Sequence, residues 1–297
     1  MKTVEDIILD FDQRNISSLR KYLPTNFCDE ASNLILENPG TVLIATGFYI
    51  LAGGAAETDG PPGAVALGDA LNSLGYKVFY ITDKYSKPFV EAISKDNQVI
   101  EFPICSHQES KTFAIEILWK YKPSILISIE RCGFTETRDY LNRYGKSIAE
   151  FNAKIDYLFE GFPVSVGIGD GGNEIGMGSL ADVIPFYENL SSPPTVTKTS
   201  KLIISSVSNW GAYGLVTSIS KNVGKRLLIS ANDEIDLIKK IVDLGAIDGT
   251  TNVNVNKVDG FNLRENSRTI TSLQHYLDQS DLNWVVYDAK TKFKYNR

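Results

Sequence analysis

Short runs rich in Val, Ile and Leu alternate with amphipathic stretches along most of this chain. The runs predict buried strands at residues 42–45, 78–82, 99–102, 124–129, 164–168, 202–204, 227–229 and 284–287. Helical spacing of apolar positions predicts helices around residues 64–74, 87–94, 111–121, 148–159, 215–220, 234–244 and 263–279. Asn232 is the expected N-cap of the helix at residues 234–244. This alternation predicts an α/β fold: a three-layer, doubly wound, mainly parallel Rossmann-like sheet with helices on both faces.

The first part of the chain is expected to be helical. Apolar side chains recur at helical spacing over residues 3–37, with breaks at Pro24 and at Asn38-Pro39-Gly40. We expect residues 1–40 to form a helical lead-in that packs on a flank of the sheet. The sequence contains no repeat, low-complexity tract or composition shift, so one α/β domain is predicted over residues 1–297, with its sheet-and-helix core over residues 41–290.

A glycine-rich stretch at residues 164–178 is the strongest local signal. The alternating apolar residues Val164, Val166 and Ile168 end in Gly169-Asp-Gly-Gly-Asn-Glu174, and Ile175 is expected to begin a helix. Glycine permits positive φ and close approach of a ligand to the backbone. Open α/β sheets hold ligands at the carboxyl ends of their strands, where Asp170 and Glu174 are expected to lie. A tight turn with solvated acids is the alternative.

Four loops share one property: each follows a predicted strand and carries polar side chains among small residues. They contain Glu57 with Asp59, Glu130 with Arg131, Asp170 with Asn173 and Glu174, and Ser208 with Asn209. In a doubly wound sheet such loops converge on one crevice. Hard carboxylate ligands suit Mg²⁺ or Mn²⁺, and the sequence predicts a divalent metal held by Glu57, Asp59, Asp170 and Glu174.

Composition and charge exclude several classes of partner. The chain has 297 residues and a net charge of −6, which disfavours nucleic acid. The glycine loops lack the phosphate-binding patterns, and acids within them repel phosphate, so no nucleotide cofactor is expected. No uncharged run is long enough to predict a membrane span. Three dispersed cysteines and an acidic start without a signal peptide predict a cytoplasmic protein. Because the charge disfavours nucleic acid, a small molecule is the expected ligand.

Five motifs together resemble a known family. They are Glu57-Thr-Asp-Gly-Pro-Pro-Gly63, Ser128-Ile-Glu-Arg131, Gly167-Ile-Gly-Asp-Gly-Gly-Asn-Glu-Ile-Gly-Met-Gly178, Val207-Ser-Asn-Trp-Gly211 and Gly245-Ala-Ile-Asp-Gly249. This set resembles the D-glutamate cyclase C-terminal domain family, over about residues 42–260. Members that carry the cyclase name are carbon–oxygen lyases that convert D-glutamate into 5-oxo-D-proline with loss of water.

The resemblance implies cyclisation chemistry, and side-chain chemistry suggests roles for the candidate residues. Asp170 or Glu174 is expected to be the base, and Arg131 to clamp a substrate carboxylate. A metal held by the acids would polarise the γ-carboxylate. Asn209 and the N–H groups of the glycine loop are expected to stabilise the oxyanion. The expected substrate-binding set is Glu130, Asn173, Asn209, Gly169, Gly171, Gly172 and Asp248.

Two other functions remain open at this point. In the named cyclase this domain follows a separate hydro-lyase-like domain, which this sequence does not contain. A regulatory domain that binds an amino acid or acidic metabolite without chemistry is therefore an alternative. The candidate partners are a second copy of the chain or a separate hydro-lyase-like domain. A metal-dependent enzyme acting on a phosphorylated substrate is the third possibility.

Overall fold

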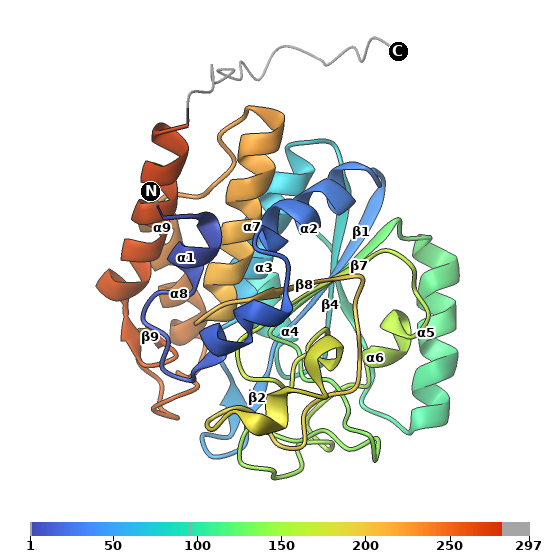
Figure 1. Cartoon of the computed structure of the whole chain (residues 1–297). Helices are drawn as coiled ribbons and strands as arrows, with labels where there is room; N and C mark the ends of the chain where they lie inside the picture. Colours follow the sequence, from blue (N-terminus) through green and yellow to red (C-terminus); the bar gives the residue numbers. More distant parts are fainter. Residues whose placement is uncertain (1, 96, 281–297) are drawn as a thin grey trace.

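A six-stranded parallel sheet forms the centre of the molecule (Figure 1). The computed structural model describes residues 2–95 and 97–280. The strands of this sheet are β1 (Thr41–Thr46), β4 (Lys77–Thr82), β5 (Val99–Glu101), β6 (Ile125–Ile129), β7 (Ser165–Gly169) and β8 (Lys201–Ile204). Two short hairpins lie outside it, β2 (Tyr49–Ile50) with β3 (Ala55–Ala56) and β9 (Lys257–Val258) with β10 (Phe261–Asn262).

The strand order places a reversal point in the middle of the sheet. The order is β5-β4-β1-β6-β7-β8, so the chain first builds outward from β1 through β4 to β5. It then returns to the other side of β1 and adds β6, β7 and β8. Because β1 and β6 are neighbours and their connections leave in opposite directions, a crevice opens at their carboxyl ends.

Helices cover both faces of the sheet, as the sequence predicts. The α-helices are α1 (Val4–Ile8), α2 (Phe27–Leu36), α3 (Pro61–Asn72), α4 (Lys87–Ile93), α5 (His107–Tyr121), α6 (Asp156–Phe159), α7 (Ser208–Val223), α8 (Ala231–Asp243) and α9 (Leu263–Asp278). Side chains of β1 alternate between two cores: Val42 and Ile44 pack with most of the helices, whereas Leu43 and Ala45 pack with α5 and α6. Both faces are apolar because parallel strands are buried on both sides.

The predicted lead-in is helical but does more than cover a flank. It comprises α1, the 3₁₀ helix η1 (Ile16–Tyr22) and α2. The side chain of Asp12 accepts backbone hydrogen bonds from Arg14, Ile16 and Ser17, and so orders the turn between α1 and η1. Asn15 within this turn has φ of 65°, a left-handed conformation that asparagine tolerates. The turn carries Arg14 toward the carboxyl edge of the sheet.

Four local predictions are wrong, and each has a physical reason. Residues 148–159 are helical only in α6, because the Ala153 carbonyl is bonded by Arg131 and Asn152 instead of a helical N–H group. Residues 227–229 form no strand, and the Leu227 N–H group donates to the Ser220 hydroxyl. Helix α8 is capped by Ser230 and not Asn232, since the side chain of Ser230 accepts from the Asp233 N–H group.

The fourth is the helix expected to begin at Ile175. That segment instead forms bridges, with a 3₁₀ turn at η2 (Gly178–Leu180), because the backbone of Gly176 and Gly178 bonds to the Thr197 carbonyl. A further 3₁₀ turn, η3, spans Ile184–Phe186. The strand predicted at residues 284–287 lies outside the described residues. Among the helices that the structure describes, none combines the length and apolar character needed to cross a membrane.

Glu234 gives a prediction about stability, because it is buried at the start of α8. Burial raises the pKa of Glu234 to about 8, partly offset by the neighbouring hydroxyl groups of Tyr213 and Ser267. The folded protein then binds a proton that the unfolded chain releases near its ordinary pKa, so this contribution to stability is present at low pH and lost as pH rises toward 8. We expect Glu234→Gln to melt several degrees above wild type at pH 9 and close to wild type at pH 5, measured by circular dichroism. Parallel melting curves at both pH values would contradict this.

Candidate functional site

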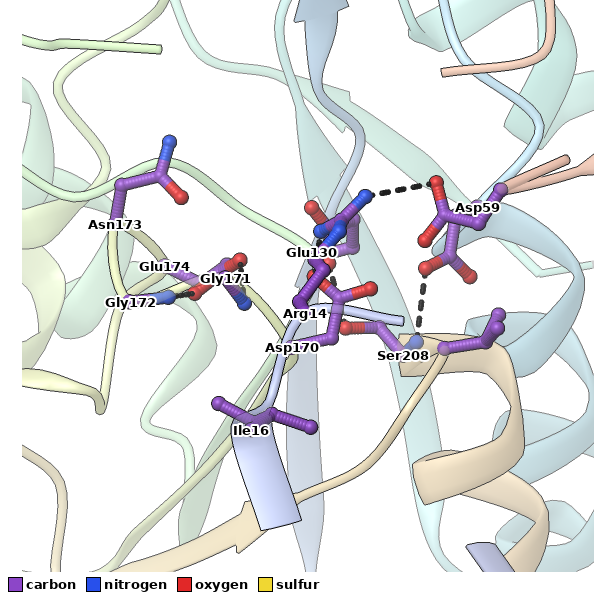
Figure 2. A network of polar contacts seen from close by, with 12 residues as sticks. Arg14, Ile16, Asp59, Glu130, Asp170, Gly171, Gly172, Asn173, Glu174 and Ser208 are labelled. Carbon is purple, nitrogen blue, oxygen red and sulfur yellow. Dashed lines mark hydrogen bonds and ion pairs between the residues drawn. The ribbon is translucent and has the colours of Figure 1, made fainter. Parts of the chain in front are cut away.

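Three carboxyl groups meet at the carboxyl edge of the sheet, at the reversal point. Asp59 follows β1 and β3, Glu130 follows β6 directly, and Asp170 follows β7. One carboxylate oxygen of each lies within 4.8 Å of the others. Figure 2 shows Glu130 and Asp170 near the centre of this group, with Asp59 on one side and Glu174 on the other. The sequence prediction that these loops converge is therefore correct for these residues.

Asp59 is held at the N-terminus of α7. Its carboxylate accepts hydrogen bonds from the N–H groups of Ser208 and Asn209, both at 2.8 Å, and from that of Gly60 at 2.9 Å. A helix N-terminus stabilises negative charge. Burial nevertheless raises the pKa of Asp59 to about 7, with a further upward contribution from Asp259. Asp59 thus titrates close to neutral pH.

Glu130 occupies the centre of the site in an unusual backbone conformation. Its φ is 47°, in the left-handed region, immediately after β6. Gly60 lies against it, and a Cβ atom on that glycine would come within 2.8 Å of the Glu130 Cβ atom. The Ser208 hydroxyl donates to Glu130 Oε2 at 2.5 Å. Burial, followed by repulsion from Glu174 and Asp59, raises the pKa of Glu130 well above its ordinary value.

The glycine loop is built around its own glutamate. Glu174 Oε1 accepts from the Gly171 N–H group and Oε2 from the Gly172 N–H group, both at 2.8 Å. A Cβ atom on Gly169 or Gly171 would lie 2.9 Å from these carboxylate oxygens, so glycine leaves room for the glutamate. The N–H groups of Gly171 and Gly172, which the sequence analysis expected to bind an oxyanion, are therefore directed at Glu174.

Arg14 supplies positive charge to the cluster, and the sequence analysis missed it. Its guanidinium donates to Asp170 and, at 3.0 Å, to Asp259 in the turn between β9 and β10. Burial alone would lower the pKa of Arg14, but Asp170 and Asp259, followed by Glu130, raise it well above its ordinary value. The Asp259-Gly260 pair was a recognisable hairpin signal. Nothing local in the sequence shows that Arg14 reaches it across more than 240 positions.

The remaining predicted residues divide into two groups. Three hold the backbone: Arg131 is fully buried and pairs with Asp83 at 2.6 Å, while Asn209 and Asp248 accept from loop N–H groups. Arg131 also donates to the carbonyls of Gly47 and Ala153, both at 2.9 Å, so it ties together the loops behind the site. Glu57, Glu130, Asn173 and Glu174 instead line a cavity.

That cavity has a volume of about 660 Å³. Its floor is acidic, formed by Glu57, Glu130 and Glu174, and Arg14 lies beside them. One wall includes Phe48 and Tyr49. The other residues that line the cavity are Ile50, Leu51, Ala52, Asn142, Arg143, Tyr144, Lys146, Gly249 and Asn252. A cavity of this size accommodates a small metabolite.

The cluster of Asp59, Glu130 and Asp170 has the donor set for a hard divalent cation. Asp170 Oδ2 is buried and has no hydrogen-bond partner among the described residues. Of the predicted metal ligands, Asp59 and Asp170 belong to this cluster, whereas Glu57 and Glu174 fall outside it among the residues described. Glu130, predicted as a substrate-binding residue, takes the third place.

Comparison with known proteins identifies the family of this chain. A family model described as D-glutamate cyclase-like, C-terminal, matches residues 4–274. The human mitochondrial D-glutamate cyclase shares 31% identity over 208 residues, which covers 63% of this chain and 34% of that protein. The match thus spans about a third of the relative's length. This chain belongs to the D-glutamate cyclase-like C-terminal family.

Proposed function

We propose that this chain catalyses the intramolecular dehydration of D-glutamate to 5-oxo-D-proline. The observation that carries the proposal is a set of mutually interacting carboxyl groups: Glu130 lines the cavity, Asp59 lies within 4.8 Å of Glu130, and both have raised pKa values. Asp59, whose pKa is raised to about 7, exchanges protons near neutral pH, and the raised pKa of Glu130 favours its protonated form. An acidic floor also attracts the ammonium group of an amino acid.

The proton balance of the reaction suits this cluster. The ammonium group first loses one proton; the resulting amine nitrogen attacks the γ-carboxyl carbon and then loses a second proton, while a γ-carboxylate oxygen gains two protons and leaves as water. The C–N bond forms and a C–O bond breaks, with no net release of protons. A carboxyl cluster that already holds one proton can donate it to the leaving γ-carboxylate oxygen and accept another from the attacking nitrogen. No external acid or base is then required.

We assign the proton transfers to Glu130. It lines the cavity, whereas Asp170 is engaged by Arg14 and Glu174 is held by two N–H groups. Asp59 and Asp170 lie within 4.8 Å of Glu130 and act as its proton reservoir. Arg131 is a positioning residue, since its guanidinium contacts Asp83 and backbone carbonyls. These assignments replace Asp170 or Glu174 as base and Arg131 as the substrate clamp.

We also propose that Mg²⁺ or Mn²⁺ can take the place of the shared proton at Asp59, Glu130 and Asp170, so that the protonated cluster and the metal-bound cluster are two alternative states of the site. The unpartnered Asp170 Oδ2 and the excess of carboxylates over cations support this cation site. A bound divalent ion would polarise the γ-carboxylate. The three carboxylates would hold the ion, and Arg14 would retain Asp259 as its partner.

The proposal is tested by following D-glutamate with the purified chain by proton NMR. We expect 5-oxoproline signals to grow with protein and Mg²⁺, and to grow more slowly after treatment with EDTA. L-glutamate and a sample without protein are the controls. Equal rates with and without EDTA would remove the metal from the proposal. Absence of product under both conditions would contradict catalysis by the chain.

The competing function is a binding domain that needs a catalytic partner. One observation favours it: the match to the human enzyme covers 34% of that protein, so the relative contains sequence outside the shared region. In the same NMR experiment, this alternative predicts shifted or broadened D-glutamate signals without product. Addition of a separately produced hydro-lyase-like domain would then restore turnover.

A further inference from the structure

The rim of the cavity is basic, in contrast to its floor. The turn formed by residues 142–146 contributes Arg143, Tyr144 and Lys146 to the cavity lining. Arg143 and Lys146 are exposed, whereas Glu57, Glu130 and Glu174 on the floor are 4%, 5% and 1% exposed. The cavity is therefore bipolar, with carboxylates inside and cations at its mouth.

The turn is ordered by its own hydrogen bonds. The side chain of Asn142 accepts from the N–H groups of Tyr144 and Lys146, both at 3.0 Å, and the Asn142 N–H group donates to the Lys146 carbonyl at 2.9 Å. A bridge between Leu141 and Ser147 closes its base. This local network fixes the positions from which the two cations extend.

The turn is also attached to the glycine loop at residues 169–174. Asn173 Nδ2 donates to the Leu141 carbonyl at 2.9 Å, and Asn173 lies between Gly172 and Glu174. A second cavity, on the Asp259 side, shares Arg14, Arg143 and Tyr144 with the first. Arg14 and Arg143 thus line both cavities.

We propose that residues 142–146 form the carboxylate-recognition element of the site, in which Arg143 and Lys146 bind the carboxylates of a dicarboxylic amino acid. The floor then receives the ammonium group, while the cations at the mouth face the α-carboxylate and one oxygen of the γ-carboxylate, whose other oxygen stays directed toward Glu130. An amino acid with a neutral side chain leaves one cation without its partner and binds less tightly. This inference rests on the proposed function for the location of the site and for its substrate, and it names the residues that select that substrate.

The test compares binding of D-glutamate with binding of D-glutamine and D-norvaline, by isothermal titration calorimetry on the full chain. We expect the wild type to prefer D-glutamate. The variant Arg143→Ala/Lys146→Ala should bind D-glutamate about 10- to 100-fold more weakly and should lose most of the preference. Arg143→Lys should keep part of it, since lysine retains the charge but not the fork of donors. Lys120→Ala, an exposed lysine in α5, is the matched control.

Binding and turnover separate this inference from the proposed function. If the wild type binds D-glutamate selectively through Arg143 and Lys146 but makes no product, the recognition element is supported and the proposed catalytic function is contradicted. If product forms and the double variant keeps wild-type affinity and wild-type preference, the recognition element is overturned and catalysis stands. Both variants lie on an exposed turn, and circular dichroism melting verifies that they fold. Equal wild-type affinity for all three amino acids would also overturn the inference.

Discussion

Glu130→Gln is expected to lower the kcat for D-glutamate cyclisation by about 10²- to 10⁴-fold, the range for loss of a positioned proton donor and acceptor. Glutamine preserves the shape of the side chain and can still bond to the Ser208 hydroxyl, which lies 2.5 Å from Glu130 Oε2. It cannot exchange a proton with Asp59 or Asp170. The measurement is the initial rate of 5-oxoproline formation by NMR or chromatography, with circular dichroism melting to confirm folding.

The control for this substitution is Glu116→Gln, which makes the same chemical change on the exposed side of α5. It should leave the rate at the wild-type level. A Glu130→Gln rate within about threefold of wild type would show that Glu130 carries no proton in the slow step. Asp170→Asn gives the comparison for the base predicted from the sequence. A larger loss in Asp170→Asn than in Glu130→Gln would return the role to Asp170.

Arg14→Gln is expected to destabilise the protein by about 3 kcal/mol at pH 8, because it leaves buried carboxylates without their cation. Arg14 lowers the pKa values of Glu57, Asp59, Glu130 and Asp170, opposing the effect of burial. Without Arg14 these pKa values rise further. Carboxyls with raised folded-state pKa values stabilise at low pH and lose that contribution as pH rises through the folded-state pKa. The loss should therefore be small at pH 5 and large at pH 8, measured by thermal or urea unfolding.

Two variants sharpen the Arg14 experiment. Arg138→Gln removes an exposed ion pair with Glu160, and we expect a change below about 0.5 kcal/mol at either pH. Arg14→Gln/Asp170→Asn removes both partners of the buried pair and should regain part of the lost stability. A destabilisation by Arg14→Gln that is the same at pH 5 and pH 8 would show that lost packing, and not charge, is responsible.

The fold class could be predicted from the sequence because the strongest patterns of strands and helices are local. Buried parallel strands read as short apolar runs, and the predicted runs at β1, β4, β6, β7 and β8 coincide with strands in the structure. The run at residues 227–229 misled because three apolar residues that are partly buried beside a core resemble a strand. Strand order depends on contacts between distant segments, and the sequence analysis left it open.

Only the acidic residues of the site could be predicted from the sequence. Asp59, Glu130 and Asp170 follow strand runs, and the rule that ligands bind at the carboxyl edge brings such residues together. Arg14 comes from the helical lead-in, where an arginine beside polar residues resembles any surface turn. Arg131 misled for the opposite reason: a conspicuous charge at a strand end was taken to face the ligand, and the structure shows it buried against Asp83. Direction of a side chain is decided by packing and not by position along the strand.

The contacts of Arg14 also have a consequence for the order of folding. Arg14 donates hydrogen bonds to Asp170 and Asp259, which lie 156 and 245 residues after it in the sequence. Contacts between such distant positions carry a large loop-closure cost and form late. During synthesis, all six strands of the main sheet are complete once residue 204 has emerged, but the partner of Arg14 at residue 259 has not. A nascent chain can thus assemble its sheet while its acidic loops still lack this bridge between the two ends.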